Sequence, residues 1–114
     1  MAQYLIMIYQ NEAQFAAAGA DEIEQMHQQH VRFAQTYGNA LRGGARLADS
    51  DAATTIRTDD AGVQTVADGM FPETKEALGG FYIVEAADLD EAIAMGKLVP
   101  AKFGGIEVRP IVPS

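Results

Sequence analysis

The chain has 114 residues, which suits one domain with one hydrophobic core, and we expect residues 1–114 to form that domain. Sixteen acidic against eight basic residues give a formal net charge of -8, which disfavours nucleic acid and anionic membrane surfaces as partners. The absence of cysteine excludes disulfides, thiolate chemistry and cysteine-based zinc sites. The apolar run near the N-terminus is too short to span a bilayer, so we expect a cytoplasmic protein with no membrane partner.

The first part of the chain predicts a strand followed by a long helix. Residues 3–9 (QYLIMIY) are apolar at nearly every position, which is typical of a strand covered on both faces. Residues 10–20 are interpreted as a surface connection. We expect the helix to run from Asp21 to Tyr37, because Asp21 and Glu24 have the spacing of a capping box. The apolar stripe of this helix contains Ile23, Met26, His30, Phe33, Ala34 and Tyr37.

Turn residues divide the middle of the chain into short segments. Residues 43–69 contain clusters of Asp, Gly and Ser, which indicate two or three short strands joined by turns. Within this stretch, we expect residues 54–57 to pair with residues 63–66 as a hairpin.

The last part of the chain predicts a strand, a helix and a final strand. Residues 80–86 are apolar on both sides of the expected strand. Asp88 and Glu91 mark the start of a second helix, which ends before Pro100. Residues 105–112 then close the chain as a strand.

The predicted order of elements points to an α+β fold. Setting the middle hairpin aside leaves the ferredoxin-like βαββαβ arrangement, in which two helices cover one face of the sheet. The strands at residues 3–9 and 80–86 are nevertheless apolar on both faces. A second copy of the same sheet is the economical cover for the other face. We therefore expect a homodimer whose two sheets pack face to face as a dimeric α+β barrel.

His30 is the first candidate for chemistry, because it lies near the middle of the apolar stripe of the first helix. An imidazole in that position needs a partner for each ring nitrogen. It is either a structural core histidine or a general acid or base at a pocket between helix and sheet. The residues alone slightly favour the core histidine, because a lone histidine has no diagnostic spacing. His27 lies further round the helix and is interpreted as structural.

Asp68 is the second candidate, because it lies at the end of a predicted strand, directly before Gly69. A carboxylate in such a position commonly caps a turn by accepting backbone N–H bonds. The alternative is that Asp68 orients His30 across the pocket, as a carboxylate orients a catalytic imidazole.

Four further side chains are candidate substrate contacts. Glu73 and Lys75 belong to a charged segment of a kind that is usually solvated, but Lys75 is the natural anion contact if the segment folds over a cavity mouth. Arg109 shares a strand face with Glu107, and we favour a structural ion pair over a substrate carboxylate as its partner. Tyr9, at the end of the first strand, is the fourth. The sequence contains no glycine-rich phosphate motif and no metal-ligand spacing, so we expect no cofactor and no metal.

Several motifs spread over nearly the whole chain carry a family resemblance. They are YLIMIY, His30 three residues before Phe33, AATTIR, VADGMFPETKEALGGFYIVE, DLDEAI and EVRPI. In this combination the chain resembles the YCII-related family, in the branch of DGPF-domain proteins. The resemblance implies a ferredoxin-like domain that dimerises into an α+β barrel, with a histidine near the floor of a pocket. It strengthens the catalytic interpretation of His30 and marks residues 68–76 as the signature segment. We expect this segment to form a lid or rim with Phe71 in the core.

The chain departs from the family pattern at two positions. Met70 stands where the branch has a proline, so the turn lacks a fixed φ angle. Val99 stands before Pro100, where other members carry the aspartate that pairs with their histidine. A carboxylate partner for His30 would then come from elsewhere, and Asp68 is the candidate.

Two functions fit these residues. The first is a cofactor-independent enzyme in which His30 performs acid/base chemistry on a small polar or aromatic metabolite. The alternative is a non-catalytic small-molecule-binding or protein-interaction module, of which a regulatory module is one form. The sequence does not decide whether the protein is an enzyme.

Overall fold

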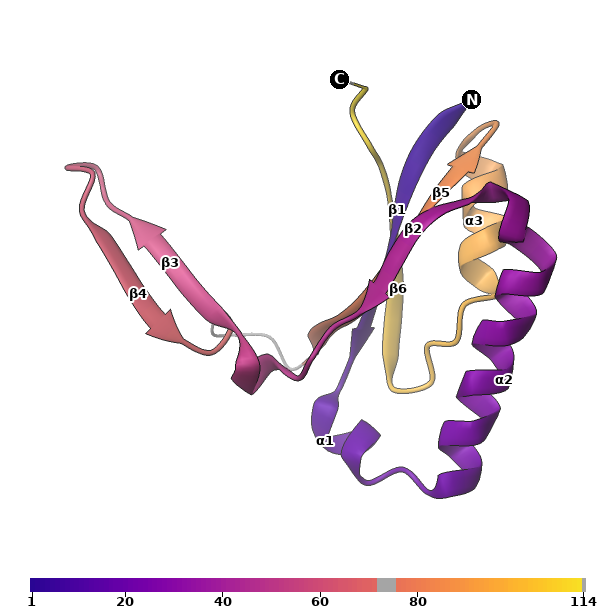
Figure 1. Ribbon diagram of the computed structural model, residues 1–114, viewed down its shortest axis with the longest axis horizontal. Coiled ribbons are helices and arrows are strands. Elements are labelled where there is room, and N and C mark those ends of the chain that lie inside the picture. Colours follow the sequence, from indigo (N-terminus) through magenta and orange to yellow (C-terminus); the bar gives the residue numbers. More distant parts are fainter. Residues whose placement is uncertain (72–75, 114) are drawn as a thin grey trace.

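The computed structural model describes residues 1–71 and 76–113, and in these ranges it shows an antiparallel sheet, helices and a separate hairpin (Figure 1). The helices are α1 (Glu12–Ala16), α2 (Ala20–Tyr37) and α3 (Leu89–Lys97), with short 3-10 helices at Gly38–Ala40 and Ser50–Ala52. The strands are β1 (Ala2–Gln10), β2 (Leu41–Arg46), β3 (Thr54–Thr58), β4 (Gln64–Asp68), β5 (Ala77–Ala86) and β6 (Gly104–Pro110). None of the helices in the described ranges combines the length and the apolar character that crossing a membrane requires.

The main sheet has four strands in the order β2-β5-β1-β6, and every neighbouring pair is antiparallel. With the β3-β4 hairpin set aside, the element order is βαββαβ, which is compatible with the predicted ferredoxin-like arrangement. Ile6 lies opposite Tyr82 on one side and Val108 on the other, which fixes the register at the centre of the sheet. The α+β class and the antiparallel sheet are therefore confirmed.

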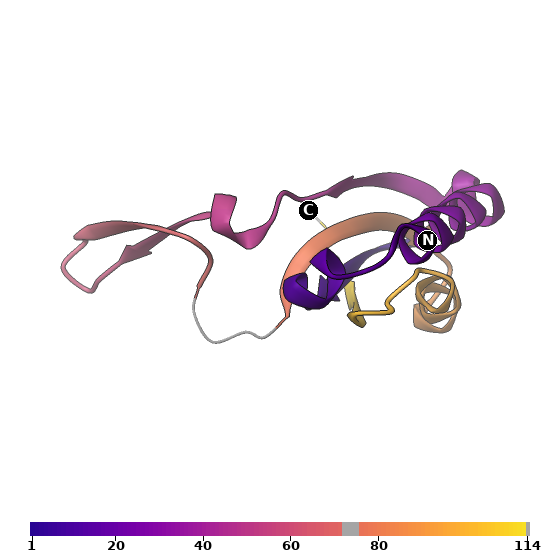
Figure 2. The same ribbon diagram turned by 90° about the horizontal axis from the view of Figure 1, so that it is seen from below.

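The inserted hairpin forms as predicted, with Ile56 opposite Val66. Its turn contains Gly62 at a φ of 82°, a left-handed conformation that glycine adopts without steric cost. In both ribbon views the hairpin projects away from the main sheet and the helices (Figures 1 and 2). Ile56 and Val66 are consequently 57% and 66% exposed.

The start of α2 and the segment before it differ from the prediction, whereas α2 ends at Tyr37 as predicted. Residues 12–16 form the short helix α1 instead of an irregular connection, because the Asn11 side chain accepts a hydrogen bond of 3.0 Å from the Gln14 N–H and caps it. α2 begins one residue early, and the Glu22 carboxylate, not Glu24, accepts a bond from the Gly19 N–H.

α3 begins as its sequence predicts. The Asp88 side chain accepts a hydrogen bond of 2.9 Å from the Glu91 N–H, and the Glu91 carboxylate accepts one of 3.2 Å from the Ala87 N–H. These reciprocal bonds satisfy two backbone donors at the start of the helix.

The core lies between the helices and one face of the sheet. Side chains alternate along a strand, so Tyr4 and Ile6 of β1 point to the helices, whereas Leu5 and Met7 point to the other face. The buried cluster on the helix side contains Tyr4, Ile6, Phe33, Val84, Ala86, Ala92, Met95 and Val99. Full burial of each large side chain in it contributes about 1.5–3 kcal/mol. No helix in the described ranges covers the opposite face, which we call the open face (Figure 2).

Candidate functional site

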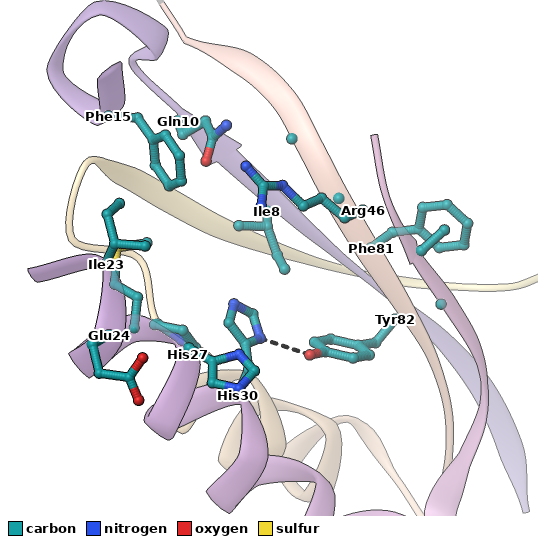
Figure 3. A pocket seen from close by; sticks show the side chains of 16 residues that line it. Ile8, Gln10, Phe15, Ile23, Glu24, His27, His30, Arg46, Phe81 and Tyr82 are labelled. Carbon is teal, nitrogen blue, oxygen red and sulfur yellow. Dashed lines mark hydrogen bonds between the residues drawn. The ribbon is translucent and has the colours of Figure 1, made fainter. Parts of the chain in front are cut away.

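A cavity of about 560 Å³ lies between the first turns of α2 and the helix-facing side of the sheet (Figure 3). Residues from α1, α2, β1, β2 and β5 line it. The apolar side chains on its wall are Ile8, Phe15, Ile23 and Met26, and the polar ones are Gln10, Glu24, His27, His30, Arg46 and Tyr82.

Two glycines of the sheet make room for the cavity, because these two positions carry no side chain beneath this part of α2. Gly44 of β2 lies opposite Tyr82, and Gly80 of β5 lies opposite Ile8. Both glycines are therefore on the helix-facing side of the sheet, and both line the cavity. A Cβ atom at Gly44 would lie 2.8 Å from the backbone oxygen of Phe81, so a larger residue does not fit without a backbone shift. The floor therefore stays open.

His30 and Tyr82 form the central contact of the site. The distance between His30 Nδ1 and the Tyr82 hydroxyl oxygen is 2.6 Å, and Figure 3 shows the two rings meeting at the cavity wall. The Tyr82 ring also packs against Phe33, with 4.7 Å between ring centroids. This packing fixes the hydroxyl, and the hydroxyl in turn fixes the imidazole.

The two groups of this pair are both neutral at neutral pH. Partial burial lowers the pKa of His30 below its usual value of 6.5, and the positive charges of His27 and Arg46 lower it further. Burial raises the pKa of Tyr82 above its usual value of 10.0. A hydroxyl can either donate to or accept from Nδ1. The bond to Tyr82 occupies Nδ1, which leaves Nε2 as the ring nitrogen that can exchange a proton with a bound molecule.

Arg46 is the positively charged group of the site. It is the last residue of β2, and its guanidinium lies over the Phe15 ring at 5.3 Å from the centroid. Figure 3 shows the side chain extending past Ile8 toward Gln10 and Phe15. Within residues 1–71 and 76–113, no carboxylate lies at ion-pair distance from it.

The chain brings Tyr82, and not Asp68, to His30. Asp68 is exposed at the end of β4, opposite Thr54 on the projecting hairpin, and it does not line the cavity. Phe71 is 50% exposed, with the Arg57 guanidinium 4.5 Å from its ring centroid. The expectation that Phe71 lies in the core is therefore wrong, because its ring lies against the Arg57 side chain of the projecting hairpin. Residues 72–75 of the predicted lid or rim lie outside the described residues.

Of the four predicted substrate contacts, Tyr9 and Arg109 lie in the described part of the chain, and neither lines this cavity. Tyr9 points to the open face, where its hydroxyl contacts Met7 Sδ at 3.7 Å. Arg109 forms the predicted ion pair with Glu107, also on that face. Glu73 and Lys75 lie outside the described residues, so their predicted contacts fall there too.

Sequence reasoning missed Tyr82 and Arg46. The period of two along β5 places Tyr82 on the same side as Val84, toward the helices, so its position was available from the sequence. Arg46 could be placed only from the pairing of β2 with β5, where it lies opposite Gly80. Within the described part of the chain, no group of three or more His, Asp or Glu side chains is arranged to hold a metal ion.

Comparisons with known proteins find matches that cover nearly the whole chain. A model of the YCII-related domain matches residues 2–114. The chain is also 35% identical over 113 residues to an uncharacterized protein of Rhizobium meliloti (strain 1021), and the match covers 95% of this chain and 90% of the relative. The function of that relative is not assigned by its name, so the chemistry must be argued from the residues of the cavity.

Proposed function

The chain belongs to the YCII-related family, and we propose that it is a cofactor-independent enzyme in which His30 performs acid/base chemistry on a small polar or aromatic metabolite. One observation carries the proposal: a partly buried imidazole, bonded to Tyr82, lines an open cavity large enough for a small molecule. A histidine with a purely structural role would have no need of such a space beside it.

The proposed chemistry follows from the protonation states of His30 and Tyr82. The lowered pKa of His30 keeps its imidazole unprotonated at neutral pH, ready to accept a proton at Nε2 from a substrate C–H or O–H group. Nδ1–H then donates to the Tyr82 oxygen, which stabilises the positive charge that forms on the ring. The same Nε2–H returns the proton to another atom of the substrate, so the enzyme is restored without a cofactor.

We also propose that two copies pack through their open faces as a dimeric α+β barrel. The support is the apolar character of this face, since Leu5, Met7, Phe81 and Ile83 lie together at its centre in the strand register. We further propose that the chain belongs to the DGPF branch, and the support is the sequence of the segment that begins at Asp68. An orienting role for Asp68 toward His30 would require the hairpin of the second copy to reach the cavity.

The second candidate function is a non-catalytic interaction or small-molecule-binding module, favoured by the hairpin. Ile56 and Val66 expose apolar surface on a two-stranded element, and such a hairpin is marginally stable without a further contact. In that case the cavity would hold a ligand without converting it.

The test of the proposed enzyme is proton exchange. Wild-type protein is incubated in D₂O with a panel of small polar and aromatic metabolites, and deuterium incorporation and product formation are followed by NMR and mass spectrometry. We expect conversion of at least one compound by the wild type, and a loss of at least about 100-fold in His30→Gln, since general acid/base groups contribute 10²–10⁴-fold.

The control for this test is the stability of the variant. His30→Gln should keep a melting temperature close to that of the wild type, and His27→Gln, in the same helix, should reduce turnover far less. If some compounds of the panel bind but none is converted, the result would support the binding module. A large loss of stability in His30→Gln would instead indicate a core histidine.

A further inference from the structure

We propose that the cavity binds a small organic acid by a single carboxylate group, which Arg46 holds beside Phe15 while the body of the molecule lies toward His30. The proposal rests on the proposed function for the role of His30 and adds the class of substrate. It commits to a monocarboxylate with an apolar or aromatic body.

The first argument is that Arg46 differs from the other two arginines of the main sheet, Arg42 and Arg109. Arg42, on the same strand, pairs with Glu85 at 3.0 Å, and Arg109 pairs with Glu107. Arg46 has no carboxylate partner among the described residues, although the chain has twice as many acidic as basic residues. An unpaired guanidinium at a cavity wall attracts an anion from outside the chain.

The second argument is that the guanidinium is held in position. Arg46 lies against the Phe15 ring, and Phe103 contacts that ring edge-on with 6.1 Å between centroids. Cation–π stacking orients the plane of the guanidinium and leaves its N–H groups available. Its planar fork then matches the two oxygens of a carboxylate, which it binds with two parallel hydrogen bonds.

The third argument concerns size and charge. A cavity of about 560 Å³ falls in the range that small-molecule sites occupy, and Ile8, Ile23 and Met26 supply apolar contacts for the body of the ligand. Glu24 also lines the cavity and adds a negative charge, so one arginine does not balance a doubly charged phosphate group. A single carboxylate fits this balance best.

The experiment uses benzoate as the probe, with benzamide as its neutral isostere and inorganic phosphate as the competing anion. Affinities are measured by titration calorimetry and by NMR shifts of cavity residues. We expect wild-type protein to bind benzoate at least about 10-fold more tightly than benzamide, since a charge-assisted bond contributes about that factor. Phosphate should bind more weakly than benzoate.

The matched variants are Arg46→Gln and Arg32→Gln, which remove the same charge. Arg32 is exposed on α2 and does not line the cavity. Benzoate affinity should fall about 10- to 100-fold in Arg46→Gln and change less than about 2-fold in Arg32→Gln. Arg46→Lys keeps the charge without the fork and should bind with intermediate affinity.

The proposal is overturned if benzamide or phosphate binds as tightly as benzoate, if benzoate binding does not saturate, or if Arg46→Gln leaves it unchanged. The comparison of benzoate with benzamide on wild-type protein decides the matter even if Arg46→Gln fails to fold. Benzoate titration and the proton-exchange assay are both carried out on wild-type protein, since the carboxylate contact is assigned to Arg46 and proton transfer to His30. Benzoate binding without turnover of any compound would contradict only the proposed enzyme. Turnover without tighter binding of benzoate than of benzamide would contradict only the carboxylate site.

Discussion

The two halves of α2 present the same kind of apolar stripe to the same sheet, yet only one half packs against it. Phe33, in the second half, is fully buried and contacts Tyr82, whereas Ile23, near the start, is 36% exposed above the cavity. The helix does not explain this difference, because its stripe continues through both halves. The sheet does, because Gly44 and Gly80 leave its floor bare beneath the first half. A cavity can thus be created by residues that lie opposite the helix.

The largest expected effect is on the free energy of unfolding, from a substitution in the packed second half of α2. Phe33→Ala should reduce the free energy of unfolding by about 3–5 kcal/mol, because it leaves a void between helix and sheet. Ile23→Ala should cost less than about 1 kcal/mol, because the side chain already borders open space. Urea denaturation of both variants measures the difference. Equal losses would show that the first half of α2 packs as tightly as the second.

The second-largest effect concerns the hydrogen bond between His30 and Tyr82. Tyr82→Phe keeps the ring against Phe33 but removes the hydroxyl from His30. We expect a loss of about 1 kcal/mol in the free energy of unfolding, and a loss of turnover larger than this stability change explains. Urea denaturation and the proton-exchange assay measure the two quantities. Unchanged turnover would show that the hydroxyl positions nothing that the reaction needs.

The smallest effect is the dependence of stability on pH. The pKa of His30 is lower in the folded chain than its usual 6.5, so the unfolded chain binds more protons between the two values. The contribution of His30 to stability is therefore fully present above about pH 6.5 and is lost as the pH falls through the folded pKa. The free energy of unfolding of the wild type should therefore fall relative to that of His30→Gln as the pH is lowered. A wild-type protein that gains stability relative to His30→Gln on acidification would contradict the lowered pKa.

The sequence predicted the arrangement of elements better than the contacts between them. Hydrophobic periodicity and capping residues placed the strands, α3 and the hairpin, because these depend on neighbours along the chain. The partner of His30 depends instead on strand register, which brings residue 82 beside residue 30. Asp68 was the expected partner because nothing in the local pattern shows that the hairpin projects away from the cavity. Arg46 was missed because only the pairing of β2 with β5 places it opposite Gly80.

Phe81 and Tyr82 are consecutive residues of β5, and their side chains leave the strand on opposite sides (Figure 3). One lies at the centre of the open face, and the other holds the imidazole. A single peptide unit therefore connects the two surfaces of the sheet. A molecule that packs on Phe81 from the open face would therefore lie one residue along β5 from the tyrosine that bonds His30.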